Sequence, residues 1–220
     1  MSALLEELRR SPALPRIVDN LQRLLAAEAG ARRRFREEIT EDQKGEFING
    51  EIVMHSPATA RHIAVIGRLN RLLGSHVSAR GLGQVYGEKA LVCLTRNDYE
   101  PDLAFFGPQK ARLIKPGTRE FPAPDLAIEV LSGSTEKRDR GVKFEDDAAH
   151  GVQEYLLVAP RPQEIEQYVL RDDAFVLKAK LAVNARYESV VVPGFSIPVV
   201  AVFDDEACNR AVLAILSSPT

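Results

Sequence analysis

Asp102, Glu129 and Lys143 are the residues whose types and surroundings could perform chemistry. Both carboxylates belong to apolar segments, Asp102 at the start of 102–106 and Glu129 inside 126–131. A carboxylate in a buried strand is costly unless it is paired with a cation or coordinates a metal. Mg²⁺ prefers a few carboxylate oxygens together with waters, and a metal held in this way can assist the hydrolysis of a phosphodiester. The two acids therefore predict a metal-assisted hydrolytic site.

Lys143 follows Glu129 by fourteen residues and lies on a predicted helix. Its ammonium could neutralise a developing negative charge or orient an attacking water. Asp139 precedes Lys143 by one helical turn, so an ordinary surface ion pair is the competing interpretation. Helix geometry alone favours that ion pair, and only the combination with the two acids points to a site.

The segments around these residues predict an α/β fold with a mixed central sheet. Apolar runs indicate strands at 84–94, 99–106, 125–131 and 153–159, with helices at 58–80 and 136–149. Short connections allow the first three strands to form an antiparallel meander, whereas the helix between the third and fourth makes that pair parallel. The predicted order is αβββαβ, with helices flanking the sheet.

Further elements extend this core at both ends. Residues 46–54 read as a hairpin, because Asn49-Gly50 is the preferred pair for a type I′ turn. Residues 164–202 predict an antiparallel C-terminal extension, and 204–216 a closing helix. Apolar residues at helical spacing predict a helical N-terminus punctuated by Gly30. We therefore expect an N-terminal helical extension at 1–34 and a single globular domain at 35–220.

Composition excludes several classes of protein. The chain has 220 residues, a formal net charge of −2 and a pI near 6.1, which argues against a dedicated DNA-packaging protein. It contains two cysteines, far too few for a cysteine-rich zinc site. No apolar run reaches the ~18 residues of a membrane-spanning helix, and the N-terminus lacks the pattern of a signal peptide. We expect a cytoplasmic protein.

The order of these motifs resembles the PD-(D/E)XK nuclease superfamily. Pro101-Asp102 corresponds to the first acidic half-motif and Glu129 to the second. The lysine of the motif is expected two residues after the glutamate, where this chain has Leu131. Some members supply the lysine from the following helix, which makes Lys143 the candidate here.

Several segments in order also resemble the Uma-two family of restriction-endonuclease-like proteins, over roughly 35–203. Gly133 and Ala159 depart from the family pattern, which more often has proline and aspartate there. The resemblance implies a restriction-endonuclease-like core and a Mg²⁺-dependent DNA endonuclease, with Mn²⁺ as a possible substitute. It also implies that Asp102 and Glu129 bind the metal, that Lys143 assists the attacking water, and that the protein is a homodimer. The segments that carry the resemblance are 46–53, 56–57, 62, 129–135, 139–144 and 154–158.

Other residues have a functional and a structural interpretation side by side. Glu46 is either a third site acid, delivered by the hairpin, or a surface acid. His62 could contact a phosphate or hold a site acid, although a histidine satisfied within the fold is the more common case. The Arg32–Arg36 segment could touch a phosphate backbone, but a solvated helix end or linker is the simpler interpretation. Ser132 and Ser134 are expected to cap the helix that follows.

Two other functions compete with a DNA endonuclease. The lysine missing at Leu131 and the acidic pI fit a catalytically silent protein that keeps the nuclease fold for DNA binding or a structural role. A metal-dependent hydrolase of small phosphoesters is the third class. Metal binding distinguishes the first two, and competition between DNA and small phosphoesters distinguishes the third.

Overall fold

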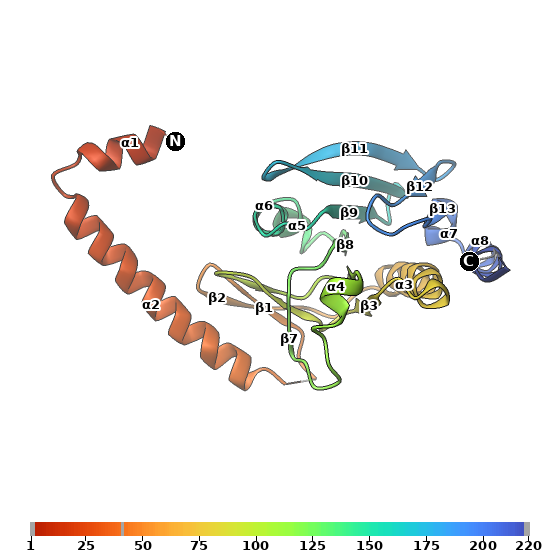
Figure 1. Cartoon of the computed structure of the whole chain (residues 1–220), viewed down its shortest axis with the longest axis horizontal. Coiled ribbons are helices and arrows are strands. Elements are labelled where there is room, and N and C mark those ends of the chain that lie inside the picture. The colour runs from red at the N-terminus through yellow and green to blue at the C-terminus, as the bar shows by residue number, and fades with distance from the viewer. Residues whose placement is uncertain (1–2, 41, 218–220) are drawn as a thin grey trace.

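The computed structural model describes residues 3–40 and 42–217 and shows an α/β protein with mixed sheets flanked by helices (Figure 1). This confirms the predicted fold class. The long helix α2 lies along one side of the molecule, and α3 and α8 lie on another (Figure 1). The helices are α1 (Ala3–Arg10), α2 (Leu14–Glu38), α3 (Ala60–Arg80), α4 (Pro108–Ala111), α5 (Glu136–Asp139), α6 (Val142–Ala149), α7 (Val200–Phe203) and α8 (Asp205–Ser217).

The larger sheet of the described chain has six strands in the order β11-β10-β9-β8-β6-β3. β8 and β9 are parallel, and the other neighbouring pairs are antiparallel. The predicted meander, parallel crossover and antiparallel extension are therefore confirmed. The bounds are β3 (Gln84–Gly87), β6 (Leu103–Phe106), β8 (Leu126–Val130), β9 (Glu154–Ala159), β10 (Glu164–Arg171) and β11 (Ala174–Ala182).

A second sheet contains the described strands β2-β1-β5-β4-β7, of which only β4 and β7 run parallel. Two expected strands, 84–94 and 99–106, are each divided between the two sheets. Glu88 and Lys89 have φ values of 37° and 59°, which end β3, and Pro101, which lacks an N–H, stands between β5 and β6. The bounds are β1 (Gly45–Ile48), β2 (Glu51–Met54), β4 (Leu91–Cys93), β5 (Asp98–Tyr99) and β7 (Glu120–Phe121).

The hairpin of β1 and β2 forms as its turn sequence predicts. Asn49 and Gly50 have φ values of 51° and 91°, the positive values that a type I′ turn requires. β1 also pairs with β5 through Phe47 and Asp98. The hairpin is therefore fixed next to the strand that leads to Asp102.

The two faces of the larger sheet carry different layers. Leu126, Ile128 and Val130 of β8 pack in one core with residues of α3, α7 and α8. Ala127 lies on the opposite face, in a cluster with residues of α6, β9 and β11. Because side chains alternate along a strand, Glu129 points to the same face as Ala127, toward α6.

The expected helix over 136–149 is divided into α5 and α6 by Arg140 and Gly141. A Cβ on Gly141 would lie 2.8 Å from the Lys137 carbonyl oxygen, closer than van der Waals contact allows. Ser132 and Ser134 do not cap α5 as expected. Their hydroxyls lie within hydrogen-bond distance of one another, and Ser132 Oγ also lies 2.9 Å from Thr135 Oγ1.

Beyond β11 the chain forms a small two-stranded sheet of β12 (Arg186–Glu188) and β13 (Ser196–Pro198), and the connecting residues 189–192 form no strand. Buried Glu154 of β9 explains the irregular backbone there, because its carboxylate accepts hydrogen bonds from that segment. The donors in that segment are Ser189 Oγ (2.6 Å) and the Val190 N–H (2.9 Å). Gln167 Nε2 of β10 (2.6 Å) and Tyr187 Oη of β12 (2.8 Å) also donate to this carboxylate.

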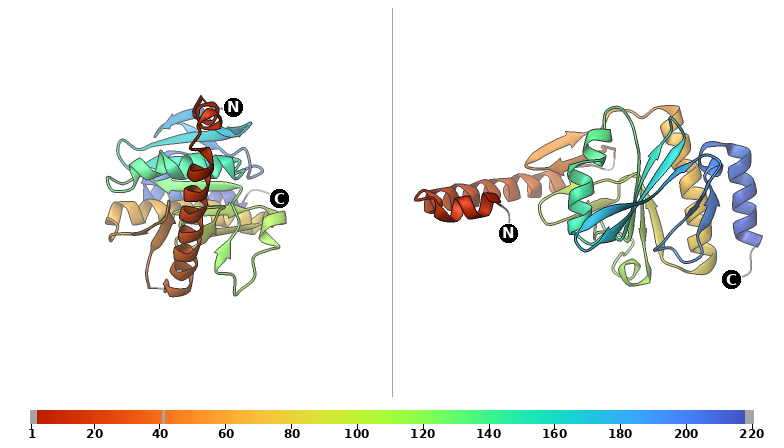
Figure 2. Two further views of the ribbon diagram at one scale, coloured as in Figure 1. Left: turned by 90° about the vertical axis from the view of Figure 1, so that its left-hand side faces the viewer. Right: turned by 90° about the horizontal axis from the view of Figure 1, so that it is seen from above.

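Helix α2 projects away from the sheets at its N-terminal end (Figure 2). It runs through Gly30 without a break, contrary to expectation, and Phe35 near its other end is buried. Leu21, Leu24 and Leu25 of the projecting half are 49–52% exposed. The predicted boundary between residues 34 and 35 falls within this helix and stays a prediction. No helix in the described part of the chain has the length and apolarity to cross a membrane.

Candidate active site

Asp102 and Glu129 are brought together by the pairing of β6 with β8. Leu103 lies opposite Ile128 in this antiparallel ladder, so the next pair along it is Asp102 and Glu129. Residues directly opposite one another project from the same face. Asp102 Oδ2 also accepts a 2.9 Å hydrogen bond from the Val130 N–H. Both carboxylates are buried.

Lys143 reaches this pair from α6. Its Nζ lies 2.6 Å from Glu129 Oε1, 2.9 Å from Glu46 Oε1 and 3.5 Å from Asp139 Oδ1. The residue is only 2% exposed. The interpretation of Lys143 as one half of a surface ion pair is therefore wrong, because Asp139 is one of three buried carboxylates around its ammonium.

Glu46 enters the same cluster from β1. It is buried, and its Oε1 also accepts a 3.0 Å hydrogen bond from the Glu100 N–H. His55 Nε2 lies 3.2 Å from the other oxygen, Oε2. Of the two interpretations of Glu46, the structure excludes the surface acid. The fold thus gathers all four candidate residues, which come from β1, β8, α6 and the corner before β6.

Lys44 and His62 contact Asp102 from the outer side. Lys44 Nζ lies 3.2 Å from Asp102 Oδ1, and His62 Nε2 lies 3.6 Å from Oδ2. Lys44 was missed by sequence reasoning, because no spacing links it to an acid 58 residues away. His62 is placed beside a site acid, which is one of the two roles considered for it.

Burial and charge act in opposite directions on these groups. Burial alone would raise the pKa of Glu46, but Lys143 and His55 lower it to about 2. Burial would likewise raise the pKa of Asp102, but His62, Lys44 and the Val130 N–H lower it to about 2. For Lys143 burial is outweighed by its three carboxylates, which raise its pKa well above the ordinary value. These three groups are therefore ionised at neutral pH.

Glu129 and Asp139 behave differently. Burial raises the pKa of both carboxyl groups, and the neighbouring acids add to this effect against the single ammonium of Lys143. The cluster has four carboxyl groups, on Glu46, Asp102, Glu129 and Asp139, but only two ammonium groups, on Lys44 and Lys143. With all four carboxyl groups ionised, and the two histidines left aside, two negative charges would lack a partner, and a bound divalent cation would offset them.

The donor set also fits a hard divalent ion held by few protein ligands. Glu129 Oε1 is buried and, despite its contact with Lys143, has no hydrogen bond of acceptable geometry. Carboxylate oxygens are the ligands that Mg²⁺ and Mn²⁺ favour. In the described residues, no cluster of three or more His, Cys, Asp or Glu residues is arranged to hold a metal. A metal at Asp102 and Glu129 would therefore have two carboxylates as protein ligands and would need waters to complete its coordination.

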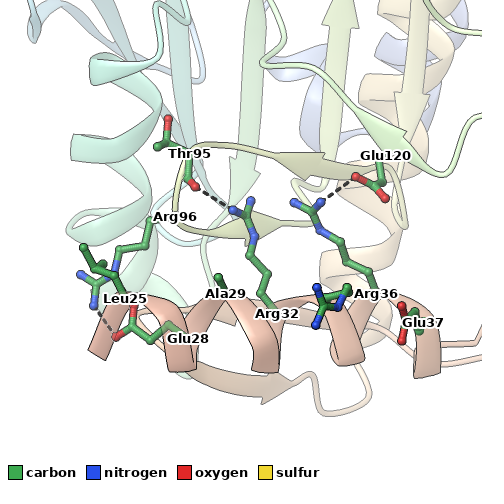
Figure 3. Close-up of a pocket in the computed structure, with 10 residues that line it drawn as sticks. Leu25, Glu28, Ala29, Arg32, Arg36, Glu37, Thr95, Arg96 and Glu120 are labelled. Atoms are coloured by element: carbon green, nitrogen blue, oxygen red, sulfur yellow. Dashed lines mark hydrogen bonds and ion pairs between the residues drawn. The ribbon is translucent and has the colours of Figure 1, made fainter. Parts of the chain in front are cut away.

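The arginines of α2 have a different role from either one expected. Arg32 and Arg36 both bind the buried carboxylate of Asp98, at 2.5 Å and 2.7 Å. Figure 3 shows both side chains in a pocket of about 570 Å³ between α2 and the β4–β5 turn, where Arg32 also donates to the Thr95 carbonyl oxygen. These two arginines anchor the helix. The residues that line this pocket do not include the Asp102–Lys143 cluster.

Comparison with known proteins identifies a family and a similar fold. A model of the Uma2 family, described as "Putative restriction endonuclease", matches residues 33–200. An uncharacterised protein of Synechocystis is 31% identical over 133 residues, which are 60% of this chain and 68% of the relative. A crystal structure described as a putative nuclease from Anabaena variabilis is similar with a TM-score of 0.67 and 17% identity. It covers 79% of this chain and 96% of its own.

Proposed function

Because the chain belongs to the Uma2 putative restriction endonuclease family, we propose that it is a divalent-metal-dependent endonuclease that hydrolyses phosphodiester bonds of DNA. The observation that carries the proposal is the buried cluster of Asp102, Glu129 and Lys143, in which acids outnumber cations. A nuclease role follows from the family, whereas the metal, the DNA substrate and the roles of individual residues are proposed from the site.

Asp102 and Glu129 would hold the ion, Mg²⁺ or in its place Mn²⁺, through oxygens on one face of the sheet. When bound, such an ion lowers the pKa of a water and offsets the charge that develops on the phosphate. Lys143 Nζ, 2.6 Å from Glu129, would orient the attacking water and donate to a phosphate oxygen. Glu46, 2.9 Å from the same ammonium, holds it in position.

Plasmid nicking tests the proposal. Purified wild-type protein should nick supercoiled DNA with Mg²⁺ or Mn²⁺ and lose this activity when EDTA is added. Asp102→Ala and Glu129→Ala should each abolish nicking. Lys178→Met, which removes an exposed charge on β11, is the matched control. Nicking that survives both carboxylate substitutions would show that the activity does not come from this cluster.

A catalytically silent protein of nuclease fold is the second candidate, and one observation favours it. Lys44 and Lys143 already occupy positions next to Asp102 and Glu129, so protein cations could be the permanent partners of both acids. Titration calorimetry decides between the two functions. Binding of Mn²⁺ that is lost in Asp102→Ala supports the endonuclease, and no Mn²⁺ binding supports the silent protein.

Cleavage of both DNA strands requires two active sites or two successive events. We propose a homodimer, by analogy with enzymes that cut both strands. Light scattering after size-exclusion chromatography should give twice the 24.3 kDa of one chain. A single-chain mass, with nicking but no linearisation of the plasmid, would contradict the dimer and leave the active site unaffected.

A further inference from the structure

The two lysines of the site differ in how firmly they are held. Lys143 contacts three carboxylates, and its side chain is 3% exposed. Lys44 contacts a single carboxylate, Asp102, and its side chain is 21% exposed. Lys44 therefore lies at the rim of the site and can leave its partner for solvent, whereas Lys143 would leave three buried acids without their cation.

The two carboxylate oxygens of Asp102 also differ in how firmly they are held. Oδ2 is fixed by the backbone N–H of Val130 at 2.9 Å, a hydrogen bond within the sheet. Oδ1 has the Lys44 ammonium at 3.2 Å. Since Asp102 and Glu129 are opposed across β6 and β8, an ion shared by both carboxylates would need an oxygen of Asp102 that is not bound elsewhere. If Lys44 moved away, Oδ1 would be available to bind the ion.

We propose that Lys44 is an exchangeable counter-ion that competes with the divalent metal for Asp102. In the metal-free protein its ammonium neutralises the carboxylate, and metal binding displaces it toward the rim. This role rests on the proposed metal site and concerns its regulation. A compact ammonium on a flexible four-carbon stem is suited to such exchange, because the displaced charge is readily hydrated.

Titration calorimetry with Mn²⁺ alone tests this competition without measuring activity. Lys44→Met should bind Mn²⁺ about tenfold more tightly than wild type, because a nearby positive charge has been removed. Lys44→Arg, which keeps the charge, should bind no more tightly than wild type. Lys178→Met controls for the loss of one remote positive charge and should leave the affinity unchanged. Lys44→Gln replaces Lys44→Met if thermal melting shows that the methionine variant is unfolded.

A spectroscopic measurement follows the displacement itself. In protein labelled with ¹³C at the lysine ε-carbons, the Lys44 signal can be assigned by its absence in Lys44→Arg. Addition of Mg²⁺ should shift this signal with the midpoint found by calorimetry with Mg²⁺. A Lys44 signal that does not change while Mg²⁺ binds would overturn the displacement.

The outcomes separate this inference from the proposed function. If wild type binds Mn²⁺, Asp102→Ala does not, and Lys44→Met binds with unchanged or weaker affinity, the role of Lys44 is rejected and the metal site stands. If Lys44→Met gains Mn²⁺ binding that wild type lacks, competition is supported in its strongest form. If neither protein binds Mn²⁺, both proposals fail.

Discussion

Two buried ionic clusters, similar in size, have opposite compositions. In the anchor cluster one carboxylate, Asp98, is shared by two guanidinium groups, those of Arg32 and Arg36. In the site cluster one ammonium, that of Lys143, is shared by three carboxylates. The anchor cluster joins α2 to β5, whereas the site cluster joins β1, β8, α5 and α6.

The electrostatic consequences differ accordingly. Burial alone would raise the pKa of Asp98, but Arg36 and Arg32 lower it overall, so this acid stays ionised. Burial raises the pKa of Glu129, because one ammonium cannot compensate three neighbouring acids. A buried cluster with enough cations has no need of a ligand, whereas one with too few can accept a metal. The balance of charge, more than burial, therefore distinguishes a structural cluster from a candidate site.

The largest effect is expected from Lys143→Met, which removes the only ammonium shared by the three carboxylates. Nicking should slow by about 10³-fold, and urea unfolding should show a loss of about 3 kcal/mol, because buried acids lose their partner. The small effect on stability expected of an exposed lysine does not apply here. Lys178→Met should match wild type in both measurements. A variant that nicks DNA at the wild-type rate would reduce Lys143 to a structural role.

Asp98→Asn should break the anchor cluster and spare the site. Two guanidinium groups would lose their shared carboxylate, and unfolding in urea should show a loss of about 3 kcal/mol. Mn²⁺ affinity measured by calorimetry on the folded variant should equal that of wild type. A change in metal affinity as large as the one caused by Lys44→Met would contradict the separation of the two clusters.

Glu100 extends the comparison. This buried acid accepts the Gly45 N–H and forms no ion pair with any described residue. Burial raises its pKa from 4.5 to about 7. The folded state therefore binds this proton more tightly than the unfolded state, and stability falls as pH rises from 4.5 to 7, by about 2 kcal/mol. Glu100→Gln should remove this part of the pH dependence when melting is followed between pH 4.5 and 7.5. An unchanged pH profile would refute it.

The smallest effect is expected where an ion pair is exposed. Arg23 binds Asp19 on the projecting half of α2, with side chains 76% and 51% exposed. Arg23→Ala should change the free energy of unfolding by less than about 0.5 kcal/mol, since solvent and salt screen the pair. A loss comparable to that of Asp98→Asn would show that exposure does not separate these pairs.

Local patterns predicted much of the fold. Asn49-Gly50 located the hairpin, and the apolar runs around Asp102 and Glu129 located the strands whose pairing opposes them. Family resemblance supplied Lys143 and Glu46, whose contact across 97 positions has no local signal. The division of residues 84–94 between two sheets was missed, because positive φ at Glu88 and Lys89 cannot be read from these residue types.

The ionic contacts that the sequence did not predict have a common physical cause. Lys44 meets Asp102 only because the hairpin folds beside β5. Arg32 and Arg36 meet Asp98 only because α2 packs on the second sheet through Phe35. Such contacts depend on how distant elements pack. Charged residues near helix ends or before strands look alike in sequence whether they are solvated or buried against a partner.

Because α2 is anchored near its C-terminal end, a small tilt at the anchor causes a larger displacement of its N-terminal end. Arg32 and Arg36, one helical turn apart, both bind the carboxylate of Asp98, four residues before Asp102 in the chain. A helix of 25 residues is ~37 Å long, so a tilt of ~5° at the anchor moves its free end by ~3 Å. A spectroscopic label at exposed Arg16, near that free end, would therefore report rearrangements of the site that are too small to observe at Asp102 itself.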